Sequence, residues 1–352
     1  MKPLPAFVWC AVVVLLLPIA ACNRGGSDGP GGDKPRVAFV TNNAEAFWTI
    51  AEAGSKKAEK EFGVELVFRK PSSGDPAVQK EIIDNLLGQD IKAIAISVID
   101  PKGQRSHLNE VAAKVPVVTQ DNDAPDSKRL CYIGTNNYLA GREVGKLVKE
   151  ALPDGGTIAI FVGQLEPLNA RQRRQGVLDE LADAAPPANL TDFPISPDTG
   201  KYGKYTLFGT LTDQPIGGQK AKENATDALT KLGDEKNLCF IGLWAYNPPA
   251  ILSAVKDAGK AGQVKIIGFD EDTATLRGIQ DGHVYATVVQ NPFMFGYEAV
   301  KIMADLAKGD KSKLPKDGIL FVPHRVVTKD GGKDRLAADA FRKELEGLLN
   351  PK

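Results

Sequence analysis

Polar and aromatic side chains recur directly beyond the apolar, strand-like runs of this 352-residue chain. These positions are Thr41–Trp48, Asp100, Asp121 and Asn122, Asn136 and Asn137, Gln164–Arg171, Asp213, Trp244–Asn247, Asp270, and Gln290 and Asn291. Carboxylate, amide and guanidinium groups take hydroxyl groups in paired hydrogen bonds, and flat aromatic rings pack against the C–H faces of a sugar ring. The set therefore suits a neutral, polyhydroxylated ligand.

The motifs of several enzyme classes are missing from the sequence. It contains no phosphate-binding GxxxxGK[ST], and its one GxSxG match, Gly25–Gly29, lies in the Gly-rich stretch rather than between a strand and a helix. With no CxxC and only three histidines, a zinc site is not expected, and no cofactor is expected either. Asp121 and Asp270 could cleave a glycoside as a pair of carboxylates, but nothing nominates a proton-donating acid. We expect a protein that is not an enzyme, with an extracellular hydrolase as an alternative.

The elements that must position these residues follow a regular pattern from Arg36 onward. The strand-like runs form two series: Val37–Thr41, Val64–Phe68, Ala93–Val98, Val115–Gln120 and Cys131–Gly134, then Thr157–Val162, Tyr205–Leu211, Leu238–Leu243, Val264–Phe269 and Val284–Val289. Helix-period segments lie between them, among them Phe47–Phe62, Val78–Leu87 and Leu139–Leu152. Apolar strands separated by helices predict parallel sheets covered on both faces, and two series predict two doubly wound domains. Ligands of such sheets bind beyond the carboxyl ends of the strands.

The first 35 residues predict export and membrane attachment. Lys2 precedes an apolar run, Phe7–Pro18, that is too short to span a bilayer comfortably. The small residues before Cys22 resemble a bacterial lipobox, in which the cysteine is lipid-modified and becomes the mature N-terminus. The Gly-rich stretch 23–35 then reads as a flexible tether. An ordinary secretory signal with an incidental cysteine is the alternative, and either way the folded part works outside the cytoplasm.

Composition agrees with a globular body of two ordinary cores. Hydrophobic residues make up 43% of the chain, and 44 Lys and Arg balance 44 Asp and Glu. No basic excess attracts nucleic acid. Cys10 lies in the signal and Cys22 is the expected lipid site, which leaves Cys131 and Cys239 inside apolar runs. We expect these two to be buried free thiols rather than a disulfide.

Five short stretches of the sequence carry a family resemblance: VAFVTNNAEAFW, PVVTQDND, NARQRRQG, IIGFDED and TVVQNPFMFG. They resemble the ribose-binding-protein family, the type I periplasmic sugar-binding proteins that feed ABC transporters. The resemblance spans about Arg36 to Thr328. It implies an α/β fold of two Rossmann-like lobes joined by three hinge crossovers, and a protein that usually acts as a monomer.

The first stretch implies aromatic stacking on the sugar. Phe47 and Trp48 match the family's aromatic pair, with Thr41 and Glu45 nearby. Many relatives carry asparagine where Glu45 falls. The alternative is that the two rings only staple the start of the following helix.

The second stretch implies a binding aspartate without its usual partner. Asp121 matches the sugar-binding aspartate of the family, whereas Asn122 stands where an arginine is usual. Asn122 lacks the charged, planar guanidinium group of that arginine, which argues against ribose as the ligand. The alternative for Asp121 is a cap of the following turn.

The remaining stretches imply contacts from the second lobe. Arg171 corresponds to the arginine that reaches into the cleft, while Arg173 and Arg174 are expected on a solvated face. Asp270 ends a strand and is expected to accept two sugar hydroxyls, and Gln290 matches the glutamine at the last crossover. We also expect a cleft-facing group, with a packed hinge-side cluster as its alternative: Trp244, Tyr246 and Asn247.

The family's chain path predicts the domain boundaries. A lipoprotein signal occupies residues 1–22 and the tether 23–35; one lobe combines 36–135 with 291–322, and the other combines 136–290 with 323–352. The crossovers should then fall near Thr135, Gln290 and Val322. Leu336–Leu349 should pack as a terminal helix, and 188–205 is a turn-rich insertion without a readable role.

These features predict an extracytoplasmic binding lipoprotein that captures a monosaccharide or related polyol and delivers it to an ABC transporter permease. The alternative is a sugar or autoinducer sensor that presents its closed form to a membrane kinase or chemoreceptor. It would bind its ligand by the same closure of two lobes, so the sequence does not distinguish it from a transport protein. The lac-repressor family shares such a body, but a secretion signal and a Gly-rich tether stand here in place of its DNA-binding segment.

Overall fold

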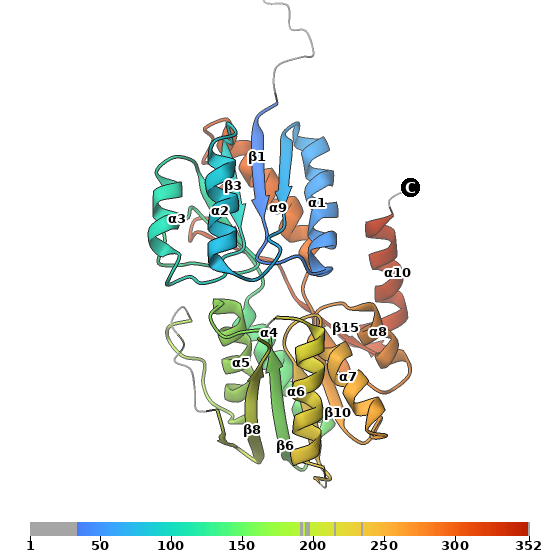
Figure 1. Cartoon of the computed structure of the whole chain (residues 1–352). Helices are drawn as coiled ribbons and strands as arrows, with labels where there is room; N and C mark the ends of the chain where they lie inside the picture. The colour runs from blue at the N-terminus through green and yellow to red at the C-terminus, as the bar shows by residue number, and fades with distance from the viewer. Residues whose placement is uncertain (1–33, 191–192, 194–197, 215, 234, 351–352) are drawn as a thin grey trace, which may run out of the picture. The chain divides into compact units, whose positions relative to one another are not determined.

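The computed structural model describes residues 34–190, 193, 198–214, 216–233 and 235–350. The predicted signal peptide, Cys22 and most of the tether therefore lie outside the described residues, as does part of the 188–205 insertion. The described residues form two α/β lobes, each built on its own sheet (Figure 1).

The first lobe is built on a six-stranded sheet in the order β12-β5-β4-β3-β1-β2, with every strand parallel to its neighbours. Its strands are β1 (Arg36–Val40), β2 (Glu65–Arg69), β3 (Ala93–Ile96), β4 (Val117–Gln120), β5 (Tyr132–Gly134) and β12 (Ile319–Phe321). Its helices are α1 (Phe47–Phe62), α2 (Pro76–Leu87), α3 (Arg105–Ala112) and α9 (Pro292–Ala307).

The second lobe is built on a nine-stranded sheet in the order β14-β15-β13-β11-β10-β9-β6-β8-β7. Its strands are β6 (Gly156–Val162), β7 (Gly200–Tyr202), β8 (Tyr205–Thr212), β9 (Leu238–Gly242), β10 (Lys265–Phe269), β11 (Ala286–Val289), β13 (Arg325–Thr328), β14 (Asp330–Gly332) and β15 (Arg335–Ala337). Its helices are α4 (Asn137–Ala151), α5 (Leu168–Leu181), α6 (Gly218–Lys231), α7 (Asn247–Asp257), α8 (Thr273–Gln280) and α10 (Ala338–Leu349).

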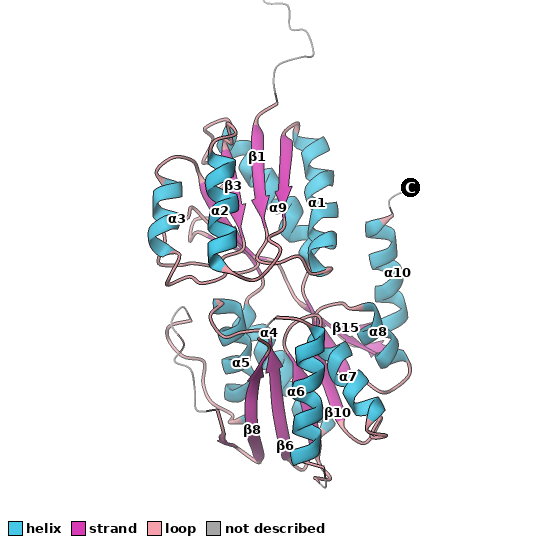
Figure 2. Ribbon diagram, in the orientation of Figure 1, coloured by secondary structure: helices cyan, strands magenta, loops and turns pink. Residues whose placement is uncertain are grey.

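Alternate side chains of each central strand enter different cores, as the period of a strand requires. Val37 and Phe39 of β1 pack with α1 and α9, whereas Ala38 and Val40 pack with α2 and α3. Strand β6 divides in the same way between the α4–α5 side and the α6–α7 side. Each sheet is therefore covered by helices on both faces, as the continuous apolar strands predict (Figure 2).

The prediction of purely parallel sheets is wrong for the edges of the second sheet. Strand β13 pairs antiparallel with β11, β14 with β15, and β7 with β8. The chain returns to the second sheet from β12 and enters it beside β11, so its direction is set by that crossover rather than by a covering helix. Short strands of this kind carry little periodic signal in the sequence.

The chain changes sheet at three places: between β5 and α4, between β11 and α9, and between β12 and β13. Helix α9 returns to pack against α1, where Gly54 and Gly296 let the two backbones approach closely. Cys131 and Cys239 are buried free thiols, as the sequence predicts.

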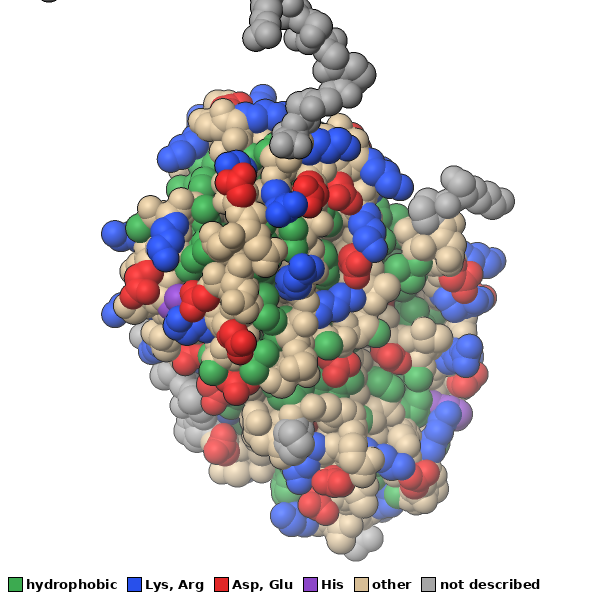
Figure 3. Space-filling model, turned by 45° about the horizontal axis from the view of Figure 1, so that its top comes forward, with side chains coloured by type: hydrophobic (Ala, Val, Ile, Leu, Met, Phe, Trp, Pro, Cys, Tyr) green, Lys and Arg blue, Asp and Glu red, His purple; other side chains and the backbone are tan. Residues whose placement is uncertain are grey.

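The surface is mixed in charge, in agreement with the formal net charge of zero. Figure 3 shows acidic and basic side chains interspersed over the face in view. Within the described part of the chain, no helix is long and apolar enough to cross a bilayer. The same residues contain no cluster of three or more His, Cys, Asp or Glu arranged to hold a metal ion.

Candidate functional site

A cavity of about 50 Å³ lies where the carboxyl ends of the two sheets face each other. Both lobes line it, and the lining residues are Asn42, Asn43, Glu45, Phe47, Trp48, Asp121, Asn169, Arg173, Trp244, Ala245, Tyr246, Asp270 and Gln290. The volume equals a few water positions, since one water needs about 10–15 Å³ by this measure. The cavity is therefore small, and wider grooves adjoin it at Glu45.

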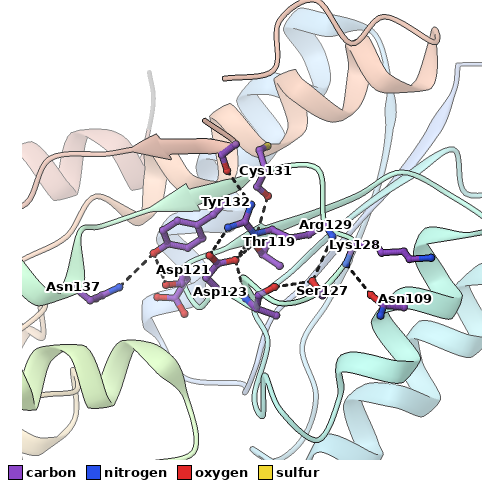
Figure 4. Close-up of polar contacts among 12 residues, drawn as sticks. Asn109, Thr119, Asp121, Asp123, Ser127, Lys128, Arg129, Cys131, Tyr132 and Asn137 are labelled. Carbon is purple, nitrogen blue, oxygen red and sulfur yellow. Dashed lines mark hydrogen bonds and ion pairs between the residues drawn. The ribbon is translucent and has the colours of Figure 1, made fainter. Parts of the chain in front are cut away.

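Asp121 supplies a buried carboxylate from the first lobe. Its Oδ2 accepts a hydrogen bond of 2.8 Å from the Ser97 hydroxyl. Beneath it, the Tyr132 hydroxyl donates to the Asp121 carbonyl oxygen at 2.9 Å (Figure 4). Burial raises the pKa of Asp121 to about 6, although the positive charge of Arg173 and the Ser97 hydrogen bond act against this rise.

Asp270 supplies the matching carboxylate from the second lobe. Its Oδ1 accepts a 2.8 Å hydrogen bond from Gln290 Nε2, and its Oδ2 lies 3.9 Å from Arg173 Nη1. Burial raises the pKa of Asp270 to about 6, against the opposing effects of Arg173 and Gln290. Two buried carboxylates with raised pKa values thus face one cavity from opposite lobes.

Arg173 is the guanidinium that lines the cavity, and the expectation that it is solvated is wrong. It is 2% exposed, stacks over the Phe269 ring at 3.9 Å, and donates to Asn137 Oδ1 at 2.8 Å and to the Leu243 carbonyl at 2.9 Å. Arg171 is half-buried and is not a lining residue. The spacing of Asn169 and Arg173 could have predicted this role. Residues four apart lie on the same face of a helix, and here that face of α5 lines the cavity.

Arg174 is also buried rather than solvated. It is 3% exposed, and its Nε donates to the Thr210 hydroxyl on β8 at 2.7 Å. Helix α5 is enclosed on several sides, so few of its positions face water. Its close fit against α4 depends on Gly141 and Gly176, where a Cβ atom would lie within 2.1–2.2 Å of the facing helix backbone.

Each lobe contributes a pair of perpendicular aromatic rings. Phe47 and Trp48 have ring centroids 5.1 Å apart at 90°, and Trp244 and Tyr246 have centroids 6.2 Å apart at 87°. The Trp48 indole N–H is held by the side-chain oxygens of Asn42 and Asn43, at 3.2 and 3.0 Å. The two pairs place flat apolar surfaces beside the carboxylates.

Several buried polar atoms around the cavity have no partner. Among them are Asn169 Oδ1, Arg173 Nη2, Trp244 Nε1 and Gln290 Oε1. Leaving such a group unpaired costs about 1–3 kcal/mol. Two donors and two acceptors therefore await a ligand that offers both kinds of hydrogen-bonding group.

Three predicted positions support the cavity from outside its lining. The Thr41 hydroxyl donates to the Asn43 carbonyl at 2.6 Å and so shapes the loop that holds Trp48. Asn122 donates to the Val98 carbonyl, and its Oδ1 accepts the backbone N–H of Asn169 in the other lobe at 3.0 Å. Asn122 therefore connects the two lobes directly.

Asn247 also lies behind the cavity, fully buried. Its Oδ1 accepts the Trp244 backbone N–H at 3.0 Å, and its Nδ2 donates to Asp213 at 2.8 Å. Of the residues predicted to face the ligand, the cavity brings together Glu45, Phe47, Trp48, Asp121, Trp244, Tyr246, Asp270 and Gln290.

The sequence of residues 37–311 matches the model of the periplasmic binding protein domain, which is more than half of the chain. The chain belongs to the periplasmic binding protein family. This membership implies an extracytoplasmic location and a binding protein rather than an enzyme.

Two curated proteins show how far the similarity of this periplasmic binding protein extends. It is 27% identical over 317 residues to a D-ribose/D-allose-binding protein of Pseudomonas aeruginosa, an alignment covering 84% of this chain and 89% of that protein. It is 26% identical over 300 residues to the ribose import binding protein RbsB of Haemophilus influenzae, covering 83% and 92%.

Solved structures share the type I fold of this periplasmic binding protein. An ABC transporter solute-binding protein from Burkholderia graminis, in complex with D-arabinose, superposes with a TM-score of 0.75 at 25% identity, over 85% of this chain and 97% of that one. GanP, a glucose-galactose binding protein from Geobacillus stearothermophilus, gives a TM-score of 0.74 at 27% identity, over 85% and 99%.

Proposed function

We propose that this protein captures a monosaccharide outside the cytoplasm and delivers it to an ABC transporter permease. One observation carries the proposal: buried, unpartnered donors and acceptors surround a small cavity between two carboxylates and two aromatic pairs. A sugar ring offers hydroxyl groups that both donate and accept, and apolar faces that stack. Relatives named for ribose, allose and arabinose support the same ligand class.

Capture would proceed by closure of the lobes about the three crossovers near Thr135, Gln290 and Val322. Closure desolvates Asp121, Asp270 and Arg173, so each must find a partner in the ligand. A hydroxyl of the wrong configuration would leave one carboxylate unpaired, which supplies discrimination between epimers. The domain boundaries predicted from the sequence, 36–135 with 291–322 and 136–290 with 323–352, are the proposed rigid bodies.

A thermal-shift screen tests this function. Protein stripped of co-purified ligand is heated with pentoses, hexoses and inositols, and a ligand that binds only the folded state must raise the melting temperature. The proposal expects a clear, saturable rise with at least one monosaccharide. No rise with any of them would overturn sugar capture.

Attachment of the binder to the membrane at Cys22 belongs to the same proposal. Several acyl chains would hold it near the permease, whereas a single chain binds membranes only marginally. The wild type should partition into the detergent phase of a Triton X-114 extraction, and Cys22→Ala should move to the aqueous phase. Equal partitioning of both proteins would contradict lipidation. Analytical ultracentrifugation of the Cys22→Ala protein should give a monomer.

A further inference from the structure

The cavity carries more negative than positive charge. Three of its lining residues are acidic, Glu45, Asp121 and Asp270, and Arg173 is the only lysine or arginine among the described residues that line it. The positive charge of Arg173 offsets the negative charge of one carboxylate. With all three acids ionised, the lining has a net charge of about two negative units when the lobes are closed.

Among the described residues, Glu271 is a further acid beside this lining. Both carboxylate oxygens of Glu271, directly behind Asp270, are buried without a hydrogen-bond partner. The positive charges of Arg325 and Arg173 both act on Glu271, and both terminal nitrogens of Arg325 bond to Glu344, at 3.0 and 2.9 Å. Burial and the negative charge of Asp270 raise the pKa of Glu271 well above its ordinary value, so Glu271 does not offset the charge of the lining residues.

Glu45 adds to the imbalance from the opposite lobe. It is half-buried, and none of the described lysines or arginines forms an ion pair with its carboxylate. Burial and the negative charge of Asp272 both raise the pKa of Glu45, and both acids line the same groove. The Asp272 carboxylate caps the start of α8, accepting the Ala274 N–H at 2.7 Å.

The aromatic rings on this wall favour a cation as well. Phe47 and Tyr246 line both the cavity and the adjoining groove of about 350 Å³, as does Glu45. The face of an aromatic ring attracts an ammonium group, and a buried carboxylate needs a positive partner. Carboxylate and rings together form a wall that accepts one positively charged group.

We propose that the ligand is a sugar with an ammonium substituent, whose positive charge is held between Glu45 and the surrounding aromatic rings. This rests on the proposed function and refines the expectation of a neutral ligand. Asp121 and Asp270 take hydroxyl groups of the ring, while the amine neutralises the excess charge at the Glu45 wall. A neutral sugar of the same shape leaves that charge buried without a partner and binds more weakly.

The test compares matched sugars in titration calorimetry of the full-length protein at pH 7. The probes are D-glucose, D-galactose and D-mannose, each beside its 2-amino-2-deoxy and N-acetylated forms. The amine is expected to bind at least tenfold more tightly than both neutral forms of the best-bound sugar. In Glu45→Gln, this ratio should fall at least fivefold, because the variant keeps the shape but loses the charge.

Glu166→Gln is the matched control. Glu166 is exposed in the groove at the mouth of the cleft and does not line the cavity, so its loss should leave the ratio unchanged. A neutral sugar that binds as tightly as its amine, with the ratio unaffected by Glu45→Gln, would overturn the inference and leave sugar capture intact. Absence of binding by every probe, neutral or charged, would overturn the proposed function itself.

Discussion

Asp121 and Asp270 end equivalent strands of the two sheets, β4 and β10, with the same unusual backbone. Their φ angles are 58° and 65°, in the left-handed region that few residues adopt. Each backbone N–H bonds to a carbonyl of the neighbouring strand, at 3.0 and 2.8 Å. Each carbonyl accepts a hydroxyl from that strand, Tyr132 or Thr287, at 2.9 Å. Equivalent backbone hydrogen bonds thus hold both carboxylates toward the cavity.

This backbone predicts different tolerance of two substitutions at Asp121. Asparagine adopts the left-handed conformation readily, whereas alanine is strained there by about 1–2 kcal/mol. Asp121→Asn should therefore melt within a few degrees of the wild type, and Asp121→Ala should be clearly less stable than Asp121→Asn. Urea denaturation measures the difference. Equal unfolding free energies for the two variants would show that the backbone at this position is not strained.

Arg173, rather than Arg171, should control affinity. Arg173→Lys loses the planar group that stacks on Phe269 and contacts Asn137 and Leu243 together, so affinity for the ligand should fall at least tenfold. Arg171→Lys is the matched control two residues away and should stay within about twofold. Titration calorimetry of both variants makes the comparison. A larger loss of affinity in Arg171→Lys than in Arg173→Lys would show that Arg171 is the arginine that binds the ligand.

The contrast between these arginines shows where sequence reasoning ends. Asp121 and Asp270 could be predicted because the ends of parallel strands meet at one edge, whatever the details of packing. Which of three nearby arginines enters the cavity depends on the rotation of α5 against α4, and that rotation depends on contacts at Gly141 and Gly176. The sequence did not predict strands β13, β14 and β15, because their pairing depends on the crossover between β12 and β13.

The raised pKa values predict a stability that depends on pH. Asp121 and Asp270 have pKa values of about 6 in the folded protein, above the ordinary value of about 3.9. The folded state then binds more protons between pH 4 and 6, so the contribution of these groups to stability is lost as pH rises through 6.

Urea denaturation of the ligand-free protein at pH 5 and pH 7 tests this sign. The unfolding free energy should fall more between these values in the wild type than in the Asp121→Asn, Asp270→Asn double variant. Asp213, whose pKa burial also raises to about 6, is present in both proteins and cancels from the comparison. An equal fall in both proteins would show that Asp121 and Asp270 do not cause the pH dependence of stability.

Close packing of α4 on α5 should be intolerant of a single methyl group. A Cβ at Gly141 would lie 2.1 Å from the Arg173 carbonyl oxygen, so Gly141→Ala should destabilise the protein by roughly 1–3 kcal/mol and displace Arg173. Gly347→Ala is the control on α10, since no atom lies within 4 Å of its Cβ position. It should stabilise the protein by up to about 1 kcal/mol through helix propensity. Thermal denaturation of both variants checks the contrast, and an unchanged Gly141→Ala protein would contradict the packing.

The most direct test of ligand capture is titration calorimetry with the sugar that the thermal screen identifies, on the wild type, Asp121→Asn and Asp270→Asn. Asparagine keeps the left-handed backbone and the size of each side chain but removes the charged acceptor. Both variants are predicted to bind at least tenfold more weakly than the wild type with one site per chain, while their melting temperatures stay within a few degrees. Unchanged affinity in both folded variants would contradict a binding site between the two lobes.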